Sequence, residues 1–125
     1  MVSISASLAK FLSGLDPILE KYNRLLSSFN VELLNEIADD FINLGNSLYV
    51  EFATMSHRVL CVTVLEAGLR LREKSRELRE RELRSEDIEY LYDIYDIFKL
   101  IADKIRSGEY EEGLREMQLK RKKRT

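Results

Sequence analysis

Residues 48–84 read LYVEFATMSHRVLCVTVLEAGLRLREKSRELRERELR, and this stretch decides the fold. From Leu48 to Leu69, apolar residues occupy nearly the whole circumference of a helix. A helix that is apolar on all sides is typical of a buried central position. The composition then changes, because eleven of the fifteen residues from Arg70 to Arg84 are charged. The stretch therefore predicts one long helix with a buried first half and a solvated second half.

This predicted helix is longer than a compact domain. From Ser47 to Arg84 it spans roughly 57 Å at about 1.5 Å per residue. A compact domain of 125 residues has a diameter of roughly 36 Å. We therefore expect the charged half to project beyond the main core. Its narrow apolar seam, formed by Leu71, Leu78 and Leu83, predicts contact with a partner helix.

Helices are also predicted on the N-terminal side of this stretch. Residues Ile4 to Leu12 form a short amphipathic segment that ends near Gly14, and Asp16-Pro17 is a typical start for a second helix. Asn30 is expected to end that helix and to cap a third one. Whether the third helix breaks at Gly45 or continues through it stays open, since a helical glycine costs only about 1 kcal/mol.

The C-terminal side predicts an antiparallel partner for the long helix. Ser85-Glu86-Asp87 supplies an N-cap and two first-turn acids, and an amphipathic stripe follows from Glu86 to Arg106. Ser107-Gly108 ends this helix, and Glu109 to Gln118 predicts a weaker last one. The predicted fold is all-α: a four- to five-helix bundle with a long central helix and a projecting antiparallel helical hairpin.

The chain is expected to form one helical domain over residues 1–118, followed by a basic tail at residues 119–125. One cysteine cannot form an internal disulfide, and the longest apolar run, Val59 to Leu65, is far short of the roughly twenty residues of a spanning helix. We therefore expect an intracellular, cytoplasmic protein that does not contact a membrane. The abundance of Glu, Arg and Ile also favours a thermophilic source.

Catalytic chemistry is poorly supported by the sequence. His57 and Cys61 share a helix face, but the chain has no second histidine or cysteine to complete a zinc site. Acidic helix faces, such as the one at Glu32, Glu36 and Asp40, lack the Glu-x-x-His pairs of di-iron bundles. Phosphate-binding glycine loops and the G-x-S-x-G elbow are also missing from the sequence. The prediction is a non-enzymatic protein with no cofactor and no metal.

Charge is strongly segregated although the net charge is only −2. Residues 85–116 carry a net −6 and residues 117–125 a net +5. The five bases at the end of the chain are a candidate site for nucleic acid or for an acidic partner: Lys120, Arg121, Lys122, Lys123 and Arg124. A solubilising tail, or one that folds back on residues 85–116, is an equally weighted alternative.

The region from Ser56-His57-Arg58 to Ser85-Glu86-Asp87-Ile88 resembles the small helical lid of AAA+ ATPases of the RuvB-like kind. In that family an arginine opens one helix and an acid-Asp-Ile triplet opens a later one. The resemblance covers less than half of the chain. The family's nucleotide-binding core is missing here, so the resemblance does not imply ATPase activity.

The sequence leaves three functions open, of which an enzyme built on His57 and Cys61 is the least favoured. The first is a non-enzymatic helical assembly subunit or adaptor that acts through protein–protein contacts, as a homo-oligomer or with a protein partner. The alternative is a small helical nucleoprotein subunit that binds a nucleic-acid backbone through its basic tail and its Arg-rich arm, residues 70–84.

Overall fold

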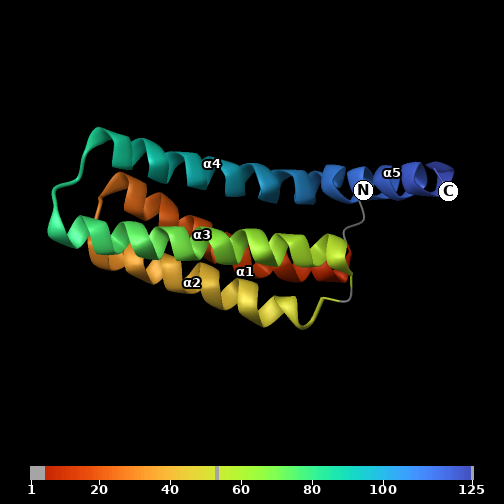
Figure 1. Ribbon diagram of the computed structural model, residues 1–125, viewed down its shortest axis with the longest axis horizontal. Coiled ribbons are helices and arrows are strands. Elements are labelled where there is room, and N and C mark those ends of the chain that lie inside the picture. The colour runs from red at the N-terminus through yellow and green to blue at the C-terminus, as the bar shows by residue number, and fades with distance from the viewer. Residues whose placement is uncertain (1–4, 53, 125) are drawn as a thin grey trace.

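The computed structural model describes residues 5–52 and 54–124, and these residues form five helices without a strand. The helices are α1 (Ala6–Ser27), α2 (Val31–Tyr49), α3 (Met55–Glu80), α4 (Ser85–Ser107) and α5 (Glu109–Arg124). The first four run up and down alongside one another as a bundle, and α5 extends past the end of the other helices (Figure 1). The predicted all-α bundle is confirmed.

Helix α1 is one continuous element, so the predicted break at Gly14 and restart at Asp16-Pro17 is wrong. It begins after Ser5, whose Oγ accepts a hydrogen bond from the backbone N–H of Leu8 at 3.3 Å; Ile4, the expected start, lies outside the described residues. Burial explains the continuity. The residues before and after the proline share one buried stripe, which offsets the roughly 3 kcal/mol that a helical proline costs. Asp16 pairs with Arg106 of α4.

Helix α2 begins where the sequence predicts. Asn30 caps it, since its Oδ1 accepts hydrogen bonds from the backbone N–H groups of Glu32 at 2.8 Å and Leu33 at 3.1 Å. The helix continues through Gly45 to Tyr49, which answers the question that the sequence left open. A turn then separates it from α3, held by Arg58, whose Nε donates to the carbonyl oxygens of Tyr49 and Phe52.

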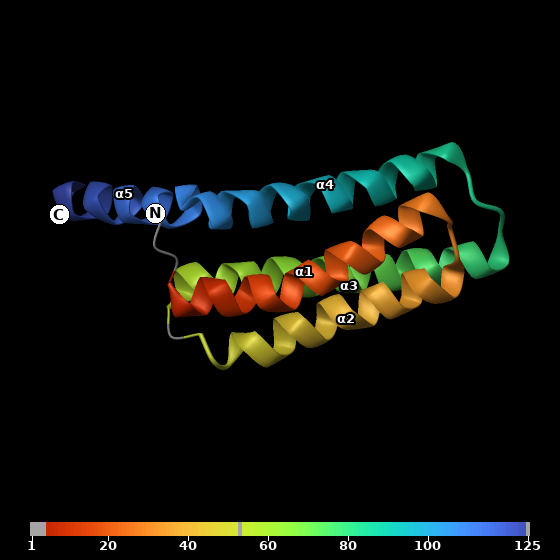
Figure 2. The same cartoon turned by 180° about the vertical axis from the view of Figure 1, so that it is seen from behind.

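The single helix predicted from Ser47 to Arg84 is therefore wrong, because α3 begins only at Met55, with Thr54 as its N-cap. The later start brings the charged half of α3 alongside α2. Arg72 pairs with Asp39 at 2.6 Å, and Arg79 lies 3.5 Å from Glu32. The α3–α4 hairpin is thus one side of the bundle, and only its turn reaches past α1 and α2 (Figures 1 and 2).

Glycines allow α2 and α3 to approach closely. A Cβ atom at Gly45 would lie 2.7 Å from the carbonyl oxygen of Cys61, and one at Gly68 would lie 2.9 Å from that of Ala38. Both obstacles are backbone atoms, which a side-chain rotation does not clear. The glycine that suggested a helix break is therefore a packing residue.

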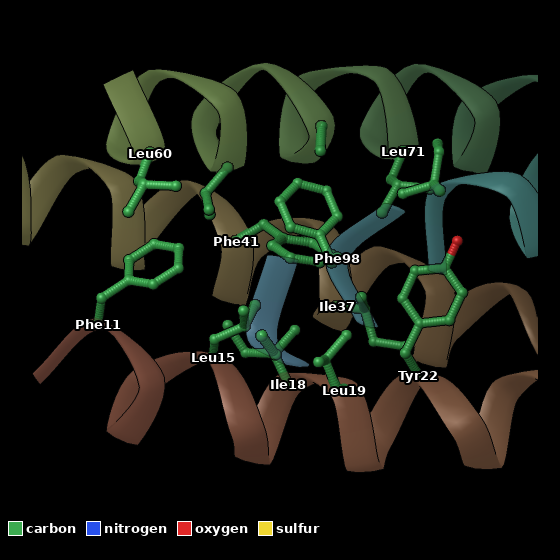
Figure 3. Close-up of a cluster of buried hydrophobic side chains, with 14 of the residues drawn as sticks. Phe11, Leu15, Ile18, Leu19, Tyr22, Ile37, Phe41, Leu60, Leu71 and Phe98 are labelled. Carbon is green, nitrogen blue, oxygen red and sulfur yellow. The ribbon is translucent and has the colours of Figure 1, made fainter. Parts of the chain in front are cut away.

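Aromatic side chains from three helices meet in the core (Figure 3). The rings of Phe41 and Phe98 lie 5.0 Å apart, and Tyr22 packs edge-on to Phe41 at 6.4 Å. The Tyr22 hydroxyl donates a hydrogen bond to the carbonyl oxygen of Leu91, which satisfies its one polar atom inside the core. Burial raises the pKa of this phenol well above its usual range. The interaction links α1 to α4 across the bundle.

A buried carboxylate organises the turn between α3 and α4. Asp87 is 3% exposed and accepts hydrogen bonds from Arg81 at 2.7 and 2.8 Å and from Lys74 at 3.1 Å. It also accepts one from the backbone N–H of Arg84 at 2.9 Å, so it caps α4 from its third position. The cap residue is accordingly Arg84, one position before the predicted Ser85.

Over residues 5–52 and 54–124, the structure contains no helix that combines the length and apolarity required to cross a membrane.

Candidate interaction surfaces

Helix α3 leaves an apolar stripe uncovered. Met55, Val59, Val62 and Leu69 are about half exposed or more, although they belong to the segment whose composition predicts burial. The buried residues of the same helix, such as Leu60 and the later Leu71, lie on its other side. The segment is therefore apolar on two sides of α3. One side packs in the core of the bundle, and the other remains exposed.

A groove of about 340 Å³ runs between α3 and α4, next to this stripe. Its lining combines small and charged residues of α3 with large apolar residues of α4: Thr63, Glu66, Ala67, Arg70, Tyr90, Asp93, Ile94, Ile97 and Phe98. Ile94 and Phe98 also belong to the core, so the groove opens directly onto it. Ile97 forms an apolar rim and remains 53% exposed. The groove exists because the small side chains of Thr63 and Ala67 do not fill the space opposite α4.

The groove becomes acidic toward the α3–α4 turn. A second hollow of about 270 Å³ shares Arg70 and Tyr90 with the first and adds Glu73, Lys74 and Glu77. Together the two linings hold four carboxylates and two cations. Both cations are already engaged: Arg70 pairs with Glu66 at 2.8 Å, and Lys74 pairs with Glu77 and Asp87. The hydrogen bond to Glu66 raises the pKa of the Arg70 guanidinium, so these contacts favour its charged form.

Helix α5 forms the second surface. Two hydrogen bonds attach its start to the bundle: the Tyr110 hydroxyl donates to the carbonyl oxygen of Ser56 at 3.4 Å, and Glu111 Oε2 accepts from the backbone N–H of Ser5 at 3.3 Å. Gly108, with φ of 84°, takes the left-handed conformation that joins α4 to α5. Beyond this junction Met117 and Leu119 are exposed at 58% and 59%. The helix therefore presents apolar side chains that its own bundle does not cover.

The seam predicted to contact a partner lies mostly inside the protein. Leu71 is fully buried, Leu78 is 9% exposed, and Leu83 packs partly buried against the same core. The reason is the late start of α3, which places these leucines against the other helices of the bundle. The structure brings Leu71 and Leu78 together in the core and leaves neither on a surface that a partner helix would contact.

The predicted basic tail is part of α5, because the helix continues to Arg124 without a break after Gln118. Lys120, Arg121 and Lys122 are exposed; the side chains of Lys123 and Arg124, and Thr125, lie outside the described part. The Arg-rich arm differs from the tail. Two of its arginines pair with carboxylates of α2, Arg72 with Asp39 and Arg79 with Glu32.

His57 and Cys61 are on α3, but their surroundings favour packing. His57 makes an edge contact with the Phe52 ring at 6.0 Å, and Cys61 is buried in the core. Burial raises the pKa of the Cys61 thiol, which disfavours the reactive thiolate. Within residues 5–52 and 54–124, no group of three or more His, Cys, Asp or Glu side chains is arranged to hold a metal ion.

Sequence reasoning missed the groove, although one signal pointed toward it. Leu48 to Leu69 carries more apolar surface than one side of a helix needs, and the surplus residues Met55, Val59 and Val62 are those left exposed.

Comparison of the chain with protein-family models, with curated proteins and with solved structures gives no match.

Proposed function

We propose that this protein is a non-enzymatic assembly subunit that associates with copies of itself through the groove between α3 and α4. The observation that carries the proposal is the exposed Ile97 rim beside a groove that opens onto the core residues Ile94 and Phe98. Exposed apolar side chains beside such an opening typically mark a surface that another protein covers. A helix is the natural occupant, since the groove is bounded by two antiparallel helices and lacks only one further helix to close it.

The other exposed apolar side chains are consistent with this location. Val59 and Val62 lie on α3 and Leu100 on α4, and all three are about half exposed. A stable interface commonly buries about 1,200–2,000 Å² in total. A partner that covered the groove and the α3 stripe together would bury the exposed apolar side chains of both. The proposed contact therefore includes both helices of the hairpin, and not the predicted leucine seam.

A charge at the groove rim is expected to separate the subunits. The Ile97→Glu variant places a carboxylate where the partner would exclude water, so we expect the dissociation constant of the dimer to rise at least 100-fold above that of the unmodified chain. Tyr92→Glu is the matched control, because Tyr92 is also an exposed aromatic or apolar residue of α4 but does not line the groove. Light-scattering chromatography over a concentration series measures both. A full chain that stays monomeric at high concentration refutes the proposal.

The exposed basic end of α5 favours a second candidate, a nucleoprotein subunit. Lys120 and Arg121 are exposed on a helix whose start is attached to the bundle and whose end extends past it (Figure 1). If the five bases neutralise about five phosphates, log K should fall with log salt with a slope of about −4 to −5. A salt series with the full chain and a chain truncated after Gln118 tests this. Equal binding by the two chains, or none at low salt, would exclude the basic end as a nucleic-acid site.

A further inference from the structure

We propose that the groove between α3 and α4 is filled by α5 of a second copy of this chain, and that the two copies exchange their α5 helices reciprocally. The inference rests on the assembly function proposed above and names the segment that makes the contact. Two features of one chain carry it. Within residues 5–52 and 54–124 no helix covers the groove, and α5 extends past the end of the bundle for most of its length (Figures 1 and 2).

The apolar residues of α5 form a short seam that fits the groove. Tyr110, Leu114 and Met117 are spaced by four and three residues, so they share one face of the helix. Tyr110 fixes the direction of this face, since it packs against α3 of its own chain. Leu114 and Met117 continue the same face, on which Leu114 is partly buried and Met117 is 58% exposed. At Met117 the seam is open to a neighbouring molecule or to solvent.

Charge complementarity selects a second copy as the occupant. Along α5, four acids and one base at residues 109–116 are followed by five bases at residues 120–124. Ile97 in the groove, and Val59 and Val62 on the exposed α3 stripe beside it, form an apolar part. Toward the α3–α4 turn this part is followed by the groove carboxylates Glu66, Glu73, Glu77 and Asp93. The apolar-then-basic order of α5 therefore matches the apolar-then-acidic order of the groove. The basic end would add to a lining in which carboxylates outnumber cations.

This match requires α5 to run in one direction along the partner's groove, and a twofold axis between the two chains gives that direction. Leu114 and Met117 meet the apolar part, and the bases meet Glu66 and Asp93, only if α5 runs parallel to the partner's α3 and antiparallel to its α4. In each chain α5 extends away from the end of α4 (Figures 1 and 2). A twofold axis that relates two chains end to end places each α5 antiparallel to the α4 helix of the other chain. Gly108 then keeps the conformation it already has.

The lengths also agree. The eleven residues of α5 that follow its attached start, Leu114 to Arg124, extend about 17 Å at about 1.5 Å per residue. The twelve residues of α3 from Val59 to Arg70 extend about 18 Å on the same scale. The part of α5 beyond its attached start is therefore about as long as the stretch of α3 that it would cover.

A pair of variants on α5 tests the exchange. Met117→Glu introduces a charge into the proposed seam and should raise the dissociation constant of the dimer at least tenfold in sedimentation equilibrium. Leu119→Glu is the matched control, since it makes an equivalent change at equal exposure two residues away, on the opposite face of the helix. It should change the dissociation constant less than threefold. Because both positions are exposed, neither variant disturbs the bundle, and circular dichroism checks this.

Disulfide trapping tests the topology. An oxidised mixture of the single variants Val62→Cys and Met117→Cys should give a linked species of twice the 14.7 kDa chain mass, whereas neither variant alone should. Linkage by Met117→Cys alone would show that the α5 helices pair with each other and would overturn the exchange. If Ile97→Glu dissociates the dimer but Met117→Glu does not, the exchange is wrong and the groove function stands. If the full chain is monomeric, both fail.

Discussion

The Gly68→Ala variant is expected to unfold at a lower denaturant concentration, with a loss of about 2 kcal/mol in the free energy of unfolding. The added Cβ would lie 2.7 Å from Ile42 Cγ1, 2.9 Å from the Ala38 carbonyl oxygen and 3.0 Å from the Ile42 backbone nitrogen. Because two of these atoms are backbone, α2 and α3 have to move apart. Overpacking of this kind costs roughly 1–3 kcal/mol, and the gain in helix propensity of about 1 kcal/mol offsets only part of it.

Gly113→Ala is the matched control for that prediction. Gly113 is also helical, but a Cβ built there meets no atom within 4 Å. The same substitution should therefore leave stability unchanged or raise it slightly, by up to about 1 kcal/mol. Guanidinium titrations followed by circular dichroism measure both variants. A Gly68→Ala protein as stable as the Gly113→Ala protein would show that α2 and α3 are not in close backbone contact.

The Asp87→Ala variant should lose about 3 kcal/mol of stability at neutral pH. It removes the cap on the Arg84 backbone N–H and the shared acceptor of Arg81 and Lys74. Loss of a cap costs roughly 1 kcal/mol, and removing one partner of a buried ion pair costs roughly 3–5 kcal/mol. Since Arg81 and Lys74 keep some solvent contact, the lower end of this range applies. Asp96→Ala, at an exposed position of α4, should change stability by less than about 0.5 kcal/mol.

The same carboxylate should make stability depend on pH in the acid range. Its hydrogen bonds to Arg81, reinforced by the Arg84 backbone N–H and Lys74, hold the pKa of Asp87 well below its ordinary value. The unfolded chain takes up a proton near pH 4, whereas folded Asp87 remains charged. Its contribution is therefore complete above about pH 4 and is lost as the pH falls further. The stability difference between the unmodified chain and Asp87→Ala should shrink from pH 7 to pH 2, and a constant difference would contradict the ion-pair account.

Local patterns were sufficient to predict much of the fold. Asn30 caps α2 as expected, and the amphipathic stripe of α4 contributes Leu91, Ile94 and Phe98 to the core. These features depend on side chains a few residues apart, so the sequence carries them directly. Ile88 of the predicted stripe is an exception. It lies at the first turn of α4 and remains exposed.

The errors arose where tertiary packing outweighs local signals. Pro17 lies within α1 because buried residues flank it on both sides. Gly45 does not break α2, because it faces the backbone of α3 at Cys61. The actual break, ahead of Met55, contains neither glycine nor proline. Its one local signal was the N-capping residue Thr54, whose Oγ1 accepts from the backbone N–H of His57.

The groove was beyond sequence reasoning for a geometrical reason. Its existence depends on the separation of α3 from α4, which the small residues Thr63 and Ala67 on one helix and Ile97 on the other do not specify by themselves. Because α3 was predicted to start too early, Leu71 and Leu78 were predicted to contact a partner helix. The bundle buries both residues. Surplus apolar surface was predictable, but its position was not.

Site-specific photo-cross-linking from the groove tests the central claim most directly. With benzoylphenylalanine at position 97, we expect an adduct of twice the chain mass whose cross-linked peptide maps to residues 114–121 of α5. The same probe at Tyr92, exposed on α4 but outside the groove, should give little adduct. Absence of an adduct from position 97, or equal adducts from both positions, would contradict the assembly of this protein through the α3–α4 groove.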